Sequence, residues 1–399
     1  MAEILGTSAG TITQGQRKVA SVASARIPVQ EVEKLINVSE DIAPLTVMLD
    51  KPGKTHIVRA PTYVHYETDE LPIGLTLGAA GQGSGVTTLA LAANGAKRVT
   101  VNTLLLAQRT GEELRVTAVN TSANTVDVDR GVGGTSAAAL NANEVISIHS
   151  FAAPDGDTSP ESVTSEPTVV TNATQIFRAS FEMSRRLRGL ETYASDEEDR
   201  VSRDALRHLN IMREQTFLFG PGISLTDPTI TGGVFHWLST NVTNQAGVAL
   251  TESGFYTIVQ NWFLRNRNRD KMVLFAGENL LKAMDGFGRD VLRYTPDTTV
   301  LGVKVKGYQT AFGTIMLKPH GLMTRLGGDD TAANKGAASW AIGLNMERVG
   351  RAQYGSEGAL TLNKDIQEND RDGSKAEWIS DEGLWLGNEK AHCLVTGIP

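Results

Sequence analysis

The segment Ser195-Asp196-Glu197-Glu198-Asp199 begins the clearest helix pattern of the chain. Ser195, followed three residues later by Glu198, matches a capping box, and such a cap contributes about 1 kcal/mol to helix stability. The four consecutive acids also favour the positive end of the helix dipole. Together these features predict that a helix starts at this point.

Beyond this start, apolar residues recur on one face of the expected helix at intervals of about four residues. The residues of this face are Val201, Ala205, Leu209, Met212 and Phe219. The sequence Gly220-Pro221-Gly222 then stops the pattern. We therefore predict a helix of about 24 residues, roughly 36 Å long, with these five apolar residues as its core face.

On the N-terminal side of the helix, two strand-rich stretches cover residues 55–67 and 168–183. Between them, alternating apolar and polar residues are separated by turns rich in Gly, Asn and Ser. We predict a small β module at about residues 86–150. Its borders at 78–85 and 154–160 have the Gly, Ser, Asp and Pro content of linkers.

The rest of the chain mixes both kinds of pattern. Residues 253–266 and 277–286 favour helices, whereas 303–308, 313–317 and 340–344 favour strands. The first 55 residues have the composition of an extended arm. The sequence therefore predicts an α+β protein, and the absence of repeats and heptads excludes a solenoid or a coiled coil.

Composition limits the possible partners. With 40% hydrophobic and 21% charged residues, the 399-residue chain is typical of a globular protein. Its formal charge of −7 argues against a protein that grips nucleic acid by neutralising phosphates, so we expect DNA to be contacted only loosely. One cysteine cannot form an internal disulfide. Neither a signal peptide nor a long apolar run is found, and we expect no membrane contact.

Residues that could carry chemistry are scattered. The seven histidines show no metal-ligand spacing, and the chain has neither a nucleophile elbow nor a phosphate-binding loop. We therefore predict no catalytic residue, no metal site and no cofactor, and we expect that the protein is not an enzyme. The acids 196–199 could be described as a cation site, but helix capping explains them fully.

Two charged sets remain as candidates for contacts between subunits. They are the basic set Arg185, Arg186 and Arg188 and the acidic set Asp196, Glu197 and Glu198. Salt bridges between copies of the chain would use such side chains, although a solvated surface is the plainer explanation.

Four segments together resemble one known family. They are residues 171–178 (TNATQIFR), 232–241 (GGVFHWLSTN), 313–320 (GTIMLKPH) and 388–392 (NEKAH). In this order they resemble the major capsid proteins of tailed bacteriophages that have the Hong Kong 97-type fold, with a β insertion in the loop called the E-loop. The resemblance covers roughly residues 15–399.

The resemblance implies an order of parts along the chain. Residues 1–54 would be an N-terminal arm, 55–185 the E-loop region with the β insertion, and 186–221 the spine helix. Residues 222–325 would form an axial domain and 326–399 the returning strands of the peripheral domain. The front of the chain lacks a long charged helical segment, so a separate scaffolding protein is expected.

The resemblance also implies a function. The subunit would assemble with itself, through hexamers and pentamers, into an icosahedral or prolate shell around double-stranded DNA. It would meet a portal and possibly a decoration protein, and it would assemble in the bacterial host cytoplasm before becoming part of the virion capsid. The alternative is a β-rich virion accessory, decoration or adhesion protein that binds through the β module; the long capped helix speaks against it.

Overall fold

The computed structural model describes residues 43–68, 73–92, 94–156, 158–188, 197–220, 222–266, 269, 271–287, 298–325 and 336–399. The chain forms two compact units. We call the first the body; it contains the described residues up to Tyr63 and those from Asn172 to Pro399. The second, Val64–Thr171, is the insertion unit.

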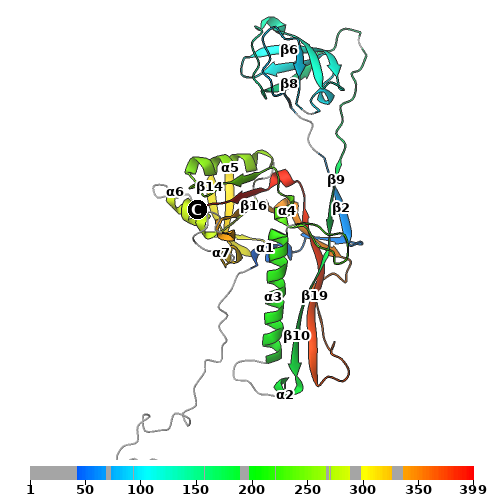
Figure 1. Ribbon diagram of the computed structural model, residues 1–399, viewed down its shortest axis with the longest axis vertical. Helices are drawn as coiled ribbons and strands as arrows, with labels where there is room; N and C mark the ends of the chain where they lie inside the picture. Colours follow the sequence, from blue (N-terminus) through cyan, green and yellow to red (C-terminus); the bar gives the residue numbers. More distant parts are fainter. Residues whose placement is uncertain are drawn as a thin grey trace, which may run out of the picture. The chain divides into compact units, whose positions relative to one another are not determined.

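A seven-stranded sheet forms one half of the body (Figure 1). In spatial order its strands are β11 (Val242–Asn244), β20 (Cys393–Thr396), β16 (Ala341–Asn345), β12 (Met272–Ala276), β15 (Gly313–Pro319), β14 (Val303–Thr310) and β13 (Thr298–Val300). Every residue of β12 and β16 is buried. Helices α5 (Glu252–Leu264) and α6 (Glu278–Phe287) share a core with one face of this sheet. Because both faces are covered, the central strands are apolar along nearly their whole length, with Asn345 as the exception in β16.

A five-stranded sheet forms the other half of the body. Its main path runs through β1 (Thr55–Val58), β17 (Val349–Tyr354), β19 (Gly373–Leu386) and β10 (Gln175–Ser184), and β18 (Thr361–Asn363) also pairs with β19. The pair β1–β17 is parallel and the other pairs are antiparallel. Strand β19 is central because it binds β10, β17 and β18.

The long helix α3 (Glu197–Phe219) lies alongside β10 and β19 (Figure 1). Its Phe217 ring meets Phe177 of β10 edge to face, with ring centroids 6.0 Å apart. Trp378 of β19 donates its indole N–H to the Ser202 carbonyl oxygen at 3.1 Å. Among the described residues, the other α-helices of the body are α1 (Pro44–Leu49), α2 (Arg185–Arg188), α4 (Val234–Trp237) and α7 (Gly321–Arg325).

One core joins these elements. It contains Leu45 of α1, Leu209 of α3, Phe275 of the seven-stranded sheet and Leu384 of the five-stranded sheet. The body is therefore a single packed unit whose contacts connect segments far apart in the sequence.

The insertion unit contains a closed six-stranded barrel. Its strands in order are β3 (Gly74–Thr76), β8 (Val145–Phe151), β5 (Thr103–Ala107), β6 (Glu112–Asn120), β7 (Thr125–Asp129) and β4 (Thr88–Ala90). The two end strands, β3 and β4, are joined by a β-bridge between Leu77 and Leu91. Two backbone hydrogen bonds flank this bridge: the Gly78 N–H donates to the Ala90 oxygen at 2.9 Å, and the Ala92 N–H donates to the Thr76 oxygen at 2.8 Å. Closure leaves the barrel without an open edge. A separate two-stranded ribbon pairs β2 (Thr62–Glu67) with β9 (Thr168–Ala173).

The barrel is larger than the sequence predicted. It begins at Gly74 rather than at about residue 86, because Leu75 and Leu77 belong to the same core as Leu89. The expected linker at 78–85 is also part of the barrel, since Gln82 forms a β-bridge with Leu140. Glycine content alone did not reveal this pairing.

The predicted parts of the rest of the chain do not coincide with the two sheets of the body. Strands β1 and β10 fall within the region 55–185 but belong to the five-stranded sheet of the body. Strands β16 and β20 come from 326–399 but lie in the seven-stranded sheet, beside strands from 222–325. The buried β16 needs a partner on each side, and it finds β12 and β20, so no single cut at residue 325 separates the two sheets.

A buried ion pair holds the barrel together. Glu112 is fully buried and accepts hydrogen bonds from Arg130 Nε and Nη2 at 2.6 and 2.8 Å and from the Ala138 N–H at 3.0 Å. Burial alone would raise the pKa of this carboxyl, but Arg130 and the backbone donors outweigh burial and lower it. Arg130 also donates to the Gly83 and Val86 oxygens. One guanidinium thus ties two loops to β6.

We predict that residues 73–152, produced alone, fold with a cooperative thermal transition seen by circular dichroism, because the barrel has its own core and closed edges. In this fragment Glu112→Gln should lower the free energy of unfolding by about 3 kcal/mol, since it leaves Arg130 buried beside an uncharged partner. Asp127→Asn, at an exposed site on β7, is the control. A fragment that melts without a cooperative transition would contradict the prediction.

A buried histidine lies at the end of the seven-stranded sheet. His392 accepts the Asn345 N–H at Nδ1, at 3.2 Å, and donates from Nε2 to the Gly387 oxygen at 3.3 Å. This arrangement requires a neutral imidazole. Burial, with a smaller contribution from the neighbouring Arg348, lowers the pKa of His392 to about 4, against the opposite effects of the Gly387 oxygen and Glu389.

We predict that the body loses stability as the pH falls from about 6.5 toward 4. In that range the unfolded chain binds a proton at His392 that the folded chain does not, so the free energy of unfolding drops by about 2 kcal/mol between pH 7 and pH 5. His392→Gln should remove this part of the pH dependence, measured by urea unfolding at both pH values. Equal pH dependence in both proteins would count against a neutral His392.

Candidate functional site

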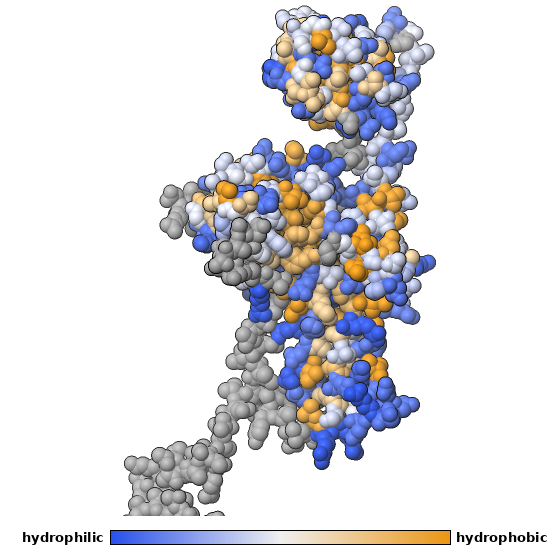
Figure 2. Space-filling model, in the orientation of Figure 1, coloured by the Kyte–Doolittle hydropathy of each residue, from blue (hydrophilic) through white to orange (hydrophobic). Residues whose placement is uncertain are grey.

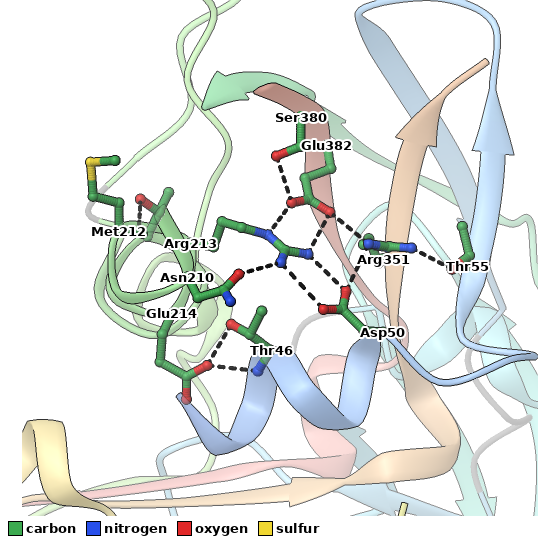
Figure 3. A network of polar contacts seen from close by, with 11 residues as sticks. Thr46, Asp50, Thr55, Asn210, Met212, Arg213, Glu214, Arg351, Ser380 and Glu382 are labelled. Atoms are coloured by element: carbon green, nitrogen blue, oxygen red, sulfur yellow. Dashed lines mark hydrogen bonds and ion pairs between the residues drawn. The ribbon is translucent and has the colours of Figure 1, made fainter. Parts of the chain in front are cut away.

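A fully buried arginine joins three elements of the body (Figure 3). Arg213 of α3 donates from Nε and Nη2 to the carboxylate of Glu382 on β19. Its Nη2 and Nη1 also reach Asp50, just after α1, at 2.8 and 3.3 Å, and Nη1 donates to Asn210 at 2.9 Å. We call Arg213, Glu382, Asp50 and Arg351 the ionic hub.

Arg351 of β17 completes the hub. Its Nη1 donates to Asp50 at 2.7 Å and to Glu382 at 3.2 Å, and Nη2 donates to the Thr55 hydroxyl at 3.1 Å. Ser380 donates to Glu382 at 3.1 Å. The hub therefore balances two guanidinium groups against two carboxylates and connects α1, α3 and the five-stranded sheet.

The electrostatics of the hub follow from burial. Burial by itself would lower the pKa of Arg213, but the charges of Glu382 and Asp50 raise it above its ordinary value. Arg213 and Glu382 have no exposed surface, whereas the Asp50 side chain is 38% exposed. A buried charge is tolerated only when it is paired and hydrogen-bonded, so each member of the hub depends on the others.

The next residue of α3, Glu214, fixes the other end of α1. Its Oε1 accepts from the Leu45 N–H at 2.9 Å and from His320 Nε2 at 2.8 Å. Its Oε2 accepts from the N–H and the hydroxyl of Thr46, both at 2.6 Å. Adjacent residues of α3 thus hold α1 at its first turn and at the residue after its last turn. Helix α1 therefore joins the rest of the body at a fixed place.

The basic candidates from the sequence lie in or beside α2. Arg185 pairs with Asp372 of the same chain at 2.8 Å, with both side chains well exposed. Arg186 is exposed, and Arg188 is the last residue of α2. The interaction that the structure gives for Arg185 is thus within the subunit, and a role between subunits stays a proposal.

The acidic candidates lie at the start of α3. Glu197 pairs with Arg200 at 2.5 Å, one turn along the same helix, and Arg200 also pairs with Asp204 at 2.8 Å. Hydrogen bonding to Arg200 lowers the pKa of Glu197. Glu198 is half-buried in the first turn. Asp196 and the expected cap Ser195 lie outside the described residues.

The residues predicted to form the core face of the long helix differ in how deeply they are buried. Leu209 is fully buried, and Ala205, Met212 and Phe219 are partly buried against the main core. Val201 is half-buried. The helix itself begins at Glu197 and ends at Phe219, a length of 23 residues.

Sequence reasoning missed the residues on which the hub depends. Arg213 and Glu214 are buried together with Phe217 and Leu218, so the second half of α3 is covered over a wider arc than the apolar pattern indicated. One feature of the sequence could have indicated this burial. Two charged residues stand between Met212 and Phe217, in the part of the helix where apolar residues face the core. Their charged partners and the α1 backbone that they hold lie more than 100 residues away in sequence and could not be read from α3 alone.

Within the described ranges, the structure shows no group of three or more His, Cys, Asp or Glu side chains that could hold a metal ion. The helices in the same ranges include none long and apolar enough to cross a membrane.

We predict that Arg213→Met lowers the free energy of unfolding by about 3–5 kcal/mol, because it leaves Glu382 and Asp50 without their main counter-charge. Arg203→Met is the matched control on the exposed side of α3, where the Arg203 side chain is 72% exposed, and it should change stability by about 0.5 kcal/mol or less. Urea unfolding of the full chain measures both. If the two variants lost similar stability, the hub would not be a main support of the body.

The chain is similar to several solved capsid structures. The capsid protein of a native GTA particle is 12% identical over 96% of this chain and 98% of that chain, with a TM-score of 0.52. The capsid protein of an empty GTA particle gives 11% identity, 96% and 99% coverage and a TM-score of 0.51. A Mycobacterium phage Adephagia chain gives 10% identity, 96% and 98% coverage and a TM-score of 0.47. No curated protein matches the chain in sequence.

The first two structures support the Hong Kong 97-type capsid fold that the resemblance implied. The model of one protein family, the SU10 major capsid protein, matches residues 9–399, which is nearly the whole chain. This match removes the alternative of an accessory or adhesion protein and assigns the chain to the virion capsid as a structural protein that assembles into a multimeric shell. The chain belongs to the SU10 major capsid protein family.

Proposed function

We propose that the subunit builds its shell from hexamers and pentamers, with the β2–β9 ribbon as a surface that a neighbouring copy covers. The ribbon exposes Val64 to 50%, Tyr66 to 69% and Val169 to 56%. Figure 2 shows hydrophobic side chains gathered around this ribbon. A two-stranded ribbon is marginal in water by itself, so burial of these side chains against a second copy would stabilise it. This exposed ribbon is the observation that carries the proposal.

The parts of the fold suggest separate roles in the shell. Helix α3 corresponds to the spine helix, and the five-stranded sheet with α3 to the peripheral domain. The seven-stranded sheet with α5 and α6 corresponds to the axial domain. The insertion unit corresponds to the E-loop with its inserted barrel. A rigid body held by the ionic hub would set the angle between neighbours, while the insertion unit adds contact area.

The proposed partners are those of a shell that packages DNA, and charge bears on one of them. The formal charge of −7 favours loose contact with packaged double-stranded DNA, because a strongly basic surface would hold the DNA as it enters. A separate scaffolding protein would guide assembly in the bacterial host cytoplasm, a portal would occupy one vertex, and a decoration protein would be an optional partner on the outer surface. The shell is icosahedral or prolate, and the subunit acts without enzymatic activity.

We predict that the purified chain assembles into capsomers or shells as its concentration rises, with or without a scaffolding protein. Tyr66→Ala together with Val169→Ala should raise the concentration needed for assembly by about tenfold, since two large apolar contacts per subunit are lost. Val145→Ala removes a similarly exposed side chain, 59%, from the barrel and serves as the control. Analytical ultracentrifugation and negative-stain microscopy measure assembly.

Two outcomes would contradict the proposal. A compact monomer at every concentration, with and without scaffold, would argue against self-assembly through this chain. Assembly that responds equally to the ribbon variant and to the Val145→Ala control would remove the ribbon as the contact surface.

A further inference from the structure

One edge of the five-stranded sheet is long and ends without a neighbour among the described strands. Strand β10 covers ten residues, Gln175–Ser184, and pairs with β19 on one side. At the opposite end of the sheet, β1 has only four residues. Long edge strands present a row of backbone donors and acceptors that can pair with another chain, and short edge strands avoid this. The strand β10 is therefore the edge suited to pairing.

The side chains of β10 alternate between two environments. Phe177, Ala179 and Met183 are buried on the face that α3 covers. On the other face Ile176, Arg178, Ser180 and Glu182 are exposed. Arg178 pairs with Glu377 at 2.6 Å and Glu182 with Arg371 at 2.6 Å, so both charges are already held on the surface of the sheet.

This sequence is complementary to itself in one antiparallel register. With Ser180 opposite Ser180 of a second copy, Arg178 faces Glu182 of that copy, and the reverse pair follows by symmetry. Moving the register by four residues in either direction places Arg178 opposite Arg178, or Glu182 opposite Glu182, and like charges directly opposite are destabilising. Charge therefore favours the register centred on Ser180.

Side-chain size favours the same register. On the face that α3 covers, Ala179 would lie opposite Phe181 of the second copy, so that each large ring has a small neighbour. The smallest exposed side chain of the strand, Ser180, would sit at the symmetry axis, where two copies of one residue meet. Both faces of β10 thus match a second β10 at one centre.

The helices that cover the sheet would also fit. Helix α3 contacts both β10, through Phe217, and β19, through Ser202. Adjacent strands lie about 4.8 Å apart, so a helix α3 seated midway between β10 and β19 would lie about 10 Å from its copy across this axis. That spacing is close to the 8–10 Å at which helices pack.

We propose that β10 pairs with β10 of a second copy, antiparallel and across a two-fold axis, and so joins the five-stranded sheets of two subunits. The inference rests on the proposed function in one respect, that a second copy is the partner. It adds the surface, the symmetry and the register of one contact.

A disulfide between two copies would report the register of the β10–β10 pair directly. Residues opposite one another in antiparallel strands have Cα atoms about 4.5–5.5 Å apart, within reach of a disulfide. Ser180→Cys should therefore give a covalent dimer under mild oxidation, in assembled particles and in concentrated unassembled protein. Ser184→Cys is the matched control, because its own counterpart would be roughly 26 Å away. The native Cys393 is buried and adds little background.

The expected result is a cross-linked dimer for Ser180→Cys and none for Ser184→Cys. Equal yields for the two variants, or no dimer from Ser180→Cys in either sample, would overturn the inference. If particles form while the Ser180→Cys dimer is absent, the proposed function stands and this contact alone fails. If the dimer forms in unassembled protein that makes no particles, the contact stands and the proposed function fails.

A charge exchange provides a second measurement. Arg178→Glu or Glu182→Arg alone should weaken the two-copy contact on the order of tenfold, measured by sedimentation, because like charges then meet twice across the axis. The double variant restores opposite charges between copies but keeps the unfavourable pairs with Glu377 and Arg371 inside each subunit. Recovery in the double variant thus identifies a contact between copies, whereas further weakening would refute it.

Discussion

The fold depends on one constraint, the burial of the Arg213 guanidinium. An arginine without access to water must find carboxylates in a fixed geometry, and Arg213 finds them on β19 and just after α1. The partner on β19, Glu382, lies 169 residues away in sequence, and the partner after α1, Asp50, lies 163 residues away. The leading segment, the central helix and the returning strands therefore have to meet at one point. Apolar packing supplies most of the stability of the body, but it is less directional, and the hub selects one arrangement of these elements.

The body and the insertion unit are stabilised in different ways. In the body, each sheet takes strands from distant parts of the chain, so neither sheet can form before most of the sequence is present. In the insertion unit, the barrel closes on itself within about 80 residues and has its own buried ion pair. A self-contained barrel can be accommodated in a loop without disturbing the body. Such an arrangement suits a shell subunit whose lattice contacts must stay constant while an added module carries another task.

The sequence predicted the fold class, the position and length of the long helix, and the presence of a β module, because each of these leaves a local periodic pattern. It did not predict the hub, since burial of Arg213 and Glu214 depends on Glu382, Asp50 and His320, which no local pattern connects to α3. It also placed the barrel border too late: Leu75 and Leu77 look like part of a loop until they are seen to share a core with Leu89. Likewise, β16 and β20 belong to the seven-stranded sheet because β16 pairs with β12 and β20 pairs with β16. This pairing is visible only in the tertiary structure.

We infer that this body, fixed by the hub, is the repeating unit of the shell. Electron cryomicroscopy of particles produced from the chain can examine this inference. We expect a shell in which every subunit keeps the Arg213–Glu382 pair and the position of α1, with hexamers and pentamers built from the same body. Particles in which α1 is detached from α3, or in which the two sheets are rearranged between subunits, would contradict it.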